Sequence, residues 1–309
     1  MIPLLYIRMV YCIPSIIFYV MVMCWIFKDR HRLFGSFFFL LVMQAITNFI
    51  VFIDNVYLIQ LADETDEETW WRVIYTGSPQ ALTRIFAFMG IHFAFVQAYV
   101  TLLISVNRMT VIVWSAKGEQ LWNVGLPICA FVCYTSPFAA TYPFLTQSAS
   151  WHFSSTSHSY VLLYNPGVSA TWMKLYIFVF AIIVASSSVN LVSLVTLFLH
   201  RKRTNFVRAQ RSMLILALLD FLVEIAVFVL MTIVYMDQPD DEDDERIALA
   251  LVPFAIDLMT LSTPYLLIAF NQSLRTRMIH SLRCHKRVHP AVRLPRPALP
   301  ATGYAQCEF

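Results

Sequence analysis

The sequence predicts an all-α membrane protein, a bundle of seven transmembrane helices with the amino terminus outside the cell and the carboxyl terminus in the cytoplasm. Three observations lead to this fold class. Of the 309 residues, 59% are apolar and 13% are charged, and soluble domains carry about twice that share of charge. Seven apolar segments each exceed the roughly 20 residues that a helix needs to cross a bilayer. All but five of the 22 Lys and Arg residues fall on one predicted side of the membrane.

The seven segments are each too long for the buried helix of a soluble protein. They cover residues 4–27, 34–61, 81–114, 121–145, 171–199, 212–236 and 247–270. The first has neither the basic leader nor the small-residue cleavage pattern of a signal peptide, so we expect an uncleaved span. We expect the helix bundle to occupy residues 1–280, and a basic, disordered cytoplasmic tail to follow over 281–309.

Charge sets the orientation of these spans. Lys and Arg gather in 28–32, in 200–211 and in the tail, whereas acidic residues gather in 63–68 and 237–245. Because basic connections stay in the cytoplasm, the acidic ones face the exterior. The one N-glycosylation sequon of the sequence, Asn271-Gln272-Ser273, then lies on the cytoplasmic side, where it is not glycosylated.

The third segment, 81–114, is predicted to be the central helix. Within it only Arg84, His92 and Arg108 can carry charge. At about 1.5 Å per residue the segment is longer than a bilayer core is thick, so its polar residues must face protein or water. Arg84 and His92 fall towards the outer side, and Arg108 falls at the inner mouth.

The longest outer loop, 146–170, allows two interpretations. Aromatic and apolar residues alternate in it with the period of a strand, which favours a short hairpin over the bundle. They are Trp151, Phe153, Tyr160, Leu162 and Tyr164. Its many serines equally suit a flexible loop.

Four acidic residues lie inside predicted spans: Asp54, Asp220, Glu224 and Asp257. Intramembrane acids are costly and are candidates for function. Glu224 and Asp257 fall near mid-membrane at the depth of His92, which makes His92 the expected titratable partner. The cluster is either a polar contact that fixes three helices together, or the floor of a ligand pocket.

Phe88, His92, Phe95 and Tyr99 share one face of the third helix, which is either packing or a pocket wall. The candidate ligand-binding set is therefore His92, Phe95, Tyr99, Glu224 and Asp257.

The inner face is basic, and attraction to lipid headgroups at about 1 kcal/mol per residue explains a basic face without any protein partner. An acidic partner docking at the inner ends of the third, fifth and sixth helices is the alternative. In the seventh helix Pro264 frees a backbone carbonyl, which permits either a hinge or a static bend.

The residues quoted so far resemble those of rhodopsin-type G-protein-coupled receptors, through Ser105-Val106-Asn107-Arg108 at the end of the third helix and Thr263-Pro264-Tyr265 in the seventh. More narrowly, the chain is similar to nematode serpentine chemoreceptors of the gamma-class superfamily (class gamma or its sibling class V). Ile13-Pro14-Ser15 and the stretches 103–108, 257–265 and 274–275 carry this likeness.

The resemblance implies a chemosensory receptor in the plasma membrane of a sensory neuron, on a cilium, that binds an unknown small molecule in the outer half of the bundle. It also implies signalling through a heterotrimeric G protein. The G-protein-facing candidates are Asn107, Arg108, Arg201, Arg203 and Arg208, and Asn107 replaces the acidic neighbour usual in such receptors. The candidate switch residues are Pro264 and Tyr265. The disulfide usual at the outer end of the third helix is absent, because neither position is Cys.

A proton-coupled membrane transporter, with its path through Asp220, Glu224, Asp257 and His92, is the alternative function. Transporters tend to have internal repeats and Gly-interrupted helices, and neither feature is prominent here. A retinal pigment would need a lysine inside the seventh span, and residues 247–270 contain none. Without an HExxH motif or paired Cys and His ligands, we expect no enzyme, no metal and no cofactor, and no nucleic-acid partner.

Overall fold

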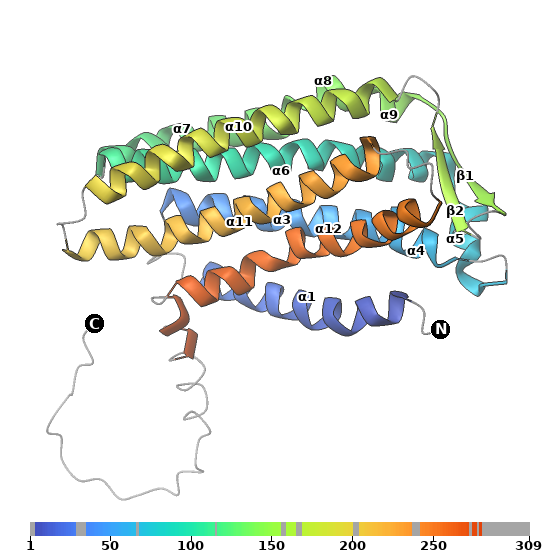
Figure 1. The fold of residues 1–309 in the computed structure, drawn as a ribbon, viewed down its shortest axis with the longest axis horizontal. Helices are drawn as coiled ribbons and strands as arrows, with labels where there is room; N and C mark the ends of the chain where they lie inside the picture. The colour runs from blue at the N-terminus through green and yellow to red at the C-terminus, as the bar shows by residue number, and fades with distance from the viewer. Residues whose placement is uncertain are drawn as a thin grey trace, which may run out of the picture. The chain divides into compact units, whose positions relative to one another are not determined.

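The structure, a computed structural model, describes residues 4–28, 35–65, 68–114, 116–155, 159–164, 169–199, 204–236, 242–271, 274–276 and 278–279. A helix lies in each of the seven predicted spans, which confirms the all-α helix bundle, while the orientation of the termini stays a prediction (Figure 1). The long helices are α1 (Leu4–Lys28), α3 (Ser36–Asn55), α6 (Gln80–Trp114), α7 (Ala116–Thr135), α10 (Ser169–Leu199), α11 (Thr204–Met236) and α12 (Glu242–Phe270).

Shorter elements complete the bundle. A π-helical turn, η1 (Val56–Gln60), and α4 (Leu61–Asp63) extend α3, while α8 (Phe138–Thr141) and α9 (Pro143–Thr146) extend α7. A 3-10 turn, η2 (Trp70–Arg72), and α5 (Val73–Thr76) lie between α4 and α6. Residues 1–271 form one compact unit, and 272–309 form a second, in which 274–276 and 278–279 are helical.

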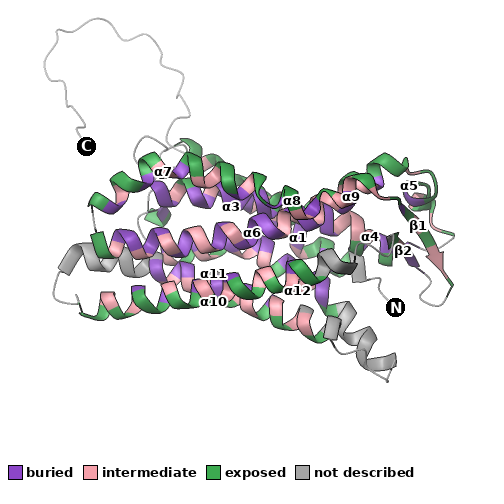
Figure 2. Cartoon of the chain, turned by 90° about the horizontal axis from the view of Figure 1, so that it is seen from above, coloured by how far each residue is buried: buried purple, intermediate pink, exposed green. Residues whose placement is uncertain are grey.

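The outer faces of the bundle are apolar, as a lipid environment requires. Among the described residues, six helices are long and apolar enough to cross a membrane, and α11 is the remaining long helix, with 33 residues. Large side chains on α7 lie open to the surroundings, with Val124 75% and Phe131 69% exposed (Figure 2). Exposed apolar faces of this extent mark contact with lipid or with protein.

The predicted central helix is central. The 35-residue α6 packs against α3, α7, α10 and α11 (Figure 1). Its residues Ala87, Ile91 and Phe95, spaced one turn apart, form a core cluster with Phe144 and Leu175.

Pro137 and Pro143 divide the fourth span. The α-helix continues through Pro127 but ends at Thr135, and it restarts after Pro137 as α8 and at Pro143 as α9. A proline has no N–H to donate and its ring displaces the preceding turn, so Pro137 interrupts the helix. At this break the Tyr134 carbonyl faces α6, where it contacts His92 Nε2.

The loop over the bundle is a hairpin. Strands β1 (Ala149–Ser154) and β2 (Ser159–Tyr164) pair antiparallel, with Trp151 opposite Leu162 and Phe153 opposite Tyr160. The ring of Tyr75 in α5 stacks on Tyr160 at 5.3 Å. Burial raises the pKa of Tyr75, whose hydroxyl donates to the Tyr57 carbonyl at 2.9 Å. Of the two interpretations of this loop, the hairpin is confirmed.

Candidate functional site

The carboxylate of Asp257, on α12, accepts several hydrogen bonds within the bundle. Its side chain is 2% exposed. Tyr11 Oη donates to Oδ2 at 2.7 Å and Cys12 Sγ approaches the same oxygen at 3.7 Å. Gln60 Nε2 at 2.9 Å and Asn55 Nδ2 at 3.4 Å donate to Oδ1. Donors from α1 and from the second span thus compensate the cost of burying this acid.

The π turn η1 explains how Asn55 and Gln60 reach one carboxylate oxygen. These residues are five apart, and in an α-helix they would point about 140° away from each other. In η1 the helix widens, with the Leu61 N–H bonded to the Val56 carbonyl five residues earlier. That widening brings residue i+5 nearly back above residue i. Both amides therefore face α12.

Arg8 lies beside this cluster and is 1% exposed. Its guanidinium carbon sits 4.6 Å from the centre of the Phe254 ring, a cation–π contact. It lies near enough to Asp257 to interact with it electrostatically. Among the described residues, none of its three nitrogens has a hydrogen-bond partner. Arg8 also interacts electrostatically with Asp63. The two carboxylates balance the charge of Arg8 without accepting its hydrogen bonds.

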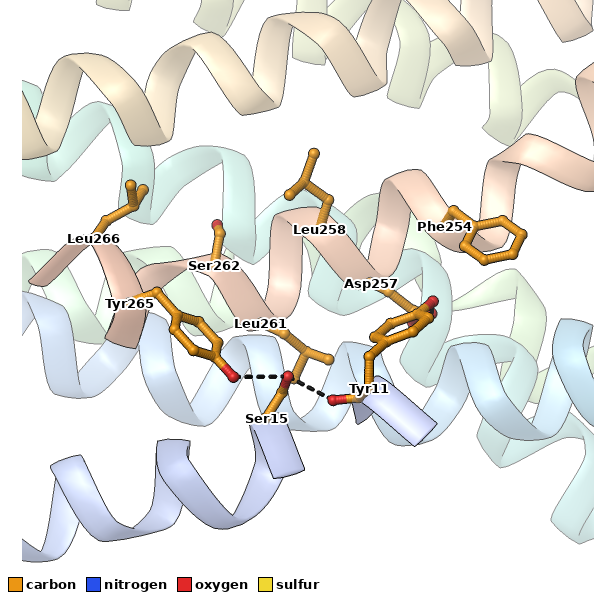
Figure 3. Close-up of a pocket in the computed structure, with 9 residues that line it drawn as sticks. All are labelled: Tyr11, Ser15, Phe254, Asp257, Leu258, Leu261, Ser262, Tyr265 and Leu266. Carbon is orange, nitrogen blue, oxygen red and sulfur yellow. Dashed lines mark hydrogen bonds between the residues drawn. The ribbon is translucent and has the colours of Figure 1, made fainter. Parts of the chain in front are cut away.

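A groove of about 410 Å³ runs between α1 and α12, next to the cluster (Figure 3). Tyr265 Oη donates to Ser15 Oγ at 2.9 Å, and Ser15 Oγ donates to the Tyr11 carbonyl at 2.6 Å. The residues that line the groove are Tyr11, Ser15, Phe254, Asp257, Leu258, Leu261, Ser262, Tyr265 and Leu266. The groove is apolar along its length and polar beside Asp257.

The predicted pairing of His92 with Asp257 is wrong. His92 faces the break after α7, with Nδ1 3.1 Å from Thr141 Oγ1 and Nε2 3.1 Å from the Tyr134 carbonyl. The helical rotation of His92 points its ring to α7 and α8, away from α12.

The remaining ligand candidates lie elsewhere in the bundle. Phe95 and Tyr99 both contact the ring of Phe178 on α10, at 4.9 and 4.8 Å. Glu224 is buried on α11, 8% exposed, and the side chain of Asp220 lies outside the described residues. Phe88 stacks on the His92 ring at 4.8 Å and packs against the core cluster that includes Phe95, so these residues are neighbours. Asp257 instead bonds to residues of α1 and of the second span. The role of all of them in ligand binding stays a prediction.

At the opposite end of α6, Asn107 and Arg108 belong to a buried network. The Arg108 guanidinium lies 3.8 Å from the centre of the Phe37 ring and donates to Asn107 Oδ1 at 2.6 Å. Asn107 Nδ2 donates to Ser36 Oγ at 2.7 Å, and Glu119 Oε1 accepts from the Ser36 N–H at 2.7 Å. The network joins the start of α3, the end of α6 and the start of α7.

The other basic candidates are only partly described. Arg201 and Arg203 lie outside the described residues, as does the tail over 281–309, and Arg208 is placed by its backbone alone, in α11. Pro264 lies within α12, where the helix continues past it. Tyr265 packs on the ring of Phe18 at 4.8 Å, so this part of α12 is tied to α1.

Sequence reasoning missed Arg8, Tyr11, Asn55 and Gln60. The signal available was Arg8 itself, a charged residue inside an apolar span, which needs a buried partner as much as an acid does. Tyr11 and Ser15 follow it at helical spacing on the same face of α1. The residue types at 56–60 do not predict a π turn.

Within the described residues, six helices that are long and apolar enough to cross a membrane, together with α11, define a multi-pass membrane helix bundle. Comparison with known proteins identifies the family. A family model, the Srg family chemoreceptor, matches residues 5–278, and the chain belongs to this family. Among curated proteins, the chain is similar to serpentine receptor class gamma-31 of Caenorhabditis elegans, with 27% identity over 226 residues that cover 71% of each chain. These matches agree with the predicted resemblance and give the transporter alternative no support.

Proposed function

We propose that this protein is a plasma-membrane chemosensory receptor that binds a small molecule and activates a heterotrimeric G protein. The match to the chemoreceptor family over nearly the whole bundle carries the proposal. A location on a sensory cilium belongs to the same proposal.

The proposed orientation has the amino terminus outside and the carboxyl terminus in the cytoplasm. It rests on the side shared by most of the Lys and Arg residues. The hairpin β1–β2 then caps the outer end, and the network around Arg108 lies at the inner end. An epitope fused after Phe309 should be reached by antibody only in permeabilised cells, and a sugar on Asn271 would contradict this orientation.

The proposed G-protein-facing residues are Asn107 and Arg108, together with Arg201, Arg203 and Arg208. Arg108 is 4% exposed, so its engagement by a partner requires that the contacts with Phe37 and Asn107 open. Pro264 and Tyr265 are the proposed hinge, because a proline within α12 weakens the helix there.

The proposed ligand region is the outer half of the bundle. The aromatic contacts of Phe95 and Tyr99 with α10, His92 at the α7 break, Glu224 on α11 and the Asp257 cluster are its components. Asp257 is supported best, because a groove lies directly beside it.

The test is Arg108→Ala in a cell line that carries a panel of G proteins. We expect loss of ligand-dependent and basal nucleotide exchange with surface expression retained, as measured by antibody to an extracellular tag. Arg84→Ala, which removes a half-buried arginine of the same helix, is the matched control. Equal exchange in wild type and Arg108→Ala would reject the role of Arg108, and exchange absent from wild type with every G protein would reject the proposed coupling.

A further inference from the structure

Arg8 is a buried cation that lacks acceptors. Its side chain is 1% exposed, and within the described part of the chain Nε, Nη1 and Nη2 all lack a hydrogen-bond partner. A guanidinium has five N–H donors, and leaving them unmatched in a dry interior is costly. Some oxygen acceptor is therefore expected at this position.

The obvious candidate acceptor, Asp257, is already occupied. Tyr11 and Gln60 bond its two oxygens at 2.7 and 2.9 Å, and Asn55 adds a third donor. The carboxylate is turned towards α1 and η1 by these bonds. Asp63 also interacts electrostatically with Arg8 but accepts none of its hydrogen bonds. Arg8 therefore has nearby counter-charges and retains its full set of donors for another oxygen-bearing group.

The α1–α12 groove and Arg8 lie on either side of the Phe254 ring. This ring lines the groove, and its centre lies 4.6 Å from the guanidinium carbon of Arg8. Arg8, Tyr11 and Ser15 are spaced i, i+3 and i+7 on α1, so they lie along one helix face, and the last two line the groove. Figure 3 shows Phe254 at the end of the groove that adjoins Tyr11 and Asp257, and Leu266 at the far end.

We propose that this site binds an amphipathic anion, with a carboxylate or phosphate head on Arg8 and an apolar chain in the groove between α1 and α12. The inference deepens the proposed function, on which it rests for the role of the ligand, by naming the chemical class. Carboxylate and phosphate present paired oxygens that match the guanidinium fork. Leu258, Leu261 and Leu266 supply the apolar wall for the chain. Because the Phe254 ring separates Arg8 from the groove, the head reaches the guanidinium when this ring turns.

The experiment uses the full-length receptor in phosphatidylcholine nanodiscs and measures binding of dodecanoate and dodecanol by calorimetry, without G protein. We expect dodecanoate to bind about ten- to a hundredfold more tightly than dodecanol, because hydrogen bonds to charged groups account for a difference of that order. Arg8→Gln should remove the difference, and Arg84→Gln, the matched control, should keep it. Equal binding of the two probes, or dodecanoate binding unchanged in Arg8→Gln, would overturn the proposal.

A second pair of variants tests the groove without altering a buried charge. Leu258 is 55% exposed and lines the groove, so Leu258→Trp can fill it and still fold. It should weaken dodecanoate binding at least tenfold, whereas Ile17→Trp, at a 65% exposed position of α1 outside the lining, should not. Unchanged binding in Leu258→Trp would place the chain elsewhere and reject the groove.

The anion can be a free ligand or a bilayer lipid. Replacing a third of the phosphatidylcholine by phosphatidylglycerol separates these sources, because a lipid headgroup on Arg8 would compete and lower the apparent affinity for dodecanoate. An unchanged affinity assigns the site to a free anion.

Nucleotide exchange by the same preparation is measured separately, so binding without exchange rejects the G-protein coupling, and exchange without binding rejects the anion site.

Discussion

Arg108 lies over the ring of Phe37, with the guanidinium carbon 3.8 Å from the ring centre. The contact joins the carboxyl-terminal end of α6 to the first turn of α3. Because the same guanidinium donates to Asn107 Oδ1, Arg108 is held inside the bundle in this conformation. Burial keeps it from any partner that docks at this end until α3 and α6 separate.

Weakening the ring contact should therefore raise basal signalling. In Phe37→Leu the apolar volume is largely kept but the cation–π contact, worth about 2 kcal/mol when desolvated, is lost. We expect basal nucleotide exchange to rise several-fold in membranes that carry equal amounts of receptor. Phe39→Leu, at a 39% exposed position two residues away, is the control. A Phe37→Leu receptor with wild-type basal exchange would show that the ring does not restrain Arg108.

Gln60 should stabilise the bundle through Asp257. Gln60→Met keeps the length of the side chain but removes the 2.9 Å hydrogen bond to Oδ1. Loss of a donor to a buried carboxylate costs about 1–3 kcal/mol, so the thermal midpoint in detergent should fall. In an Asp257→Leu background the same substitution should cost far less. Equal effects in the two backgrounds would mean that Gln60 acts independently of Asp257.

The sequence was sufficient for the spans because long apolar segments have few other structures open to them. Period-two alternation made a hairpin one of two interpretations of 146–170, between which the structure decides. The length of 81–114 and its few charged residues predicted the central helix. The partners of Asp257 were beyond reach for a specific reason. Counting residues gives the depth of a side chain but not its rotation, and the turn Val56–Gln60 changes the rotation of everything beyond it. His92 faces α7 and α8, whereas Asp257 faces α1 and the second span.

The close approach of α6 to the second span depends on Gly90. A Cβ added at this position would overlap with Asp54 Oδ2. Gly90→Ala should therefore destabilise the protein by on the order of 1–3 kcal/mol, as overpacking does, despite the better helix propensity of Ala. Thermal unfolding in detergent measures the effect.

The matched control for Gly90→Ala is Gly125→Ala, because nothing lies within 4 Å of a Cβ added at Gly125. That variant should be neutral or slightly more stable. Asp54→Ala should rescue Gly90→Ala by removing the carboxylate. If the double variant is no more stable than Gly90→Ala, the clash with Asp54 is not the cause.

The break after α7 should depend on Thr141, whose hydroxyl has one proton and two neighbours. It lies 3.0 Å from the Pro137 carbonyl and 3.1 Å from His92 Nδ1. Because a carbonyl accepts only, the contact of Nε2 with the Tyr134 carbonyl places a proton on Nε2. A neutral His92 then accepts a hydrogen bond from the Thr141 hydroxyl at Nδ1. A charged His92 instead donates from Nδ1 to Thr141, whose hydroxyl then donates to the Pro137 carbonyl.

In either protonation state Thr141 completes the bonding of His92, so Thr141→Val leaves one buried polar atom unmatched at nearly constant volume. We expect a loss of about 1–3 kcal/mol in the free energy of unfolding. Thr135→Val is the control, since the Thr135 hydroxyl bonds to the Phe131 carbonyl one turn back and is exposed. In a His92→Leu background Thr141→Val should cost less, and an undiminished cost there would show that the threonine serves the backbone of α8 and not the imidazole.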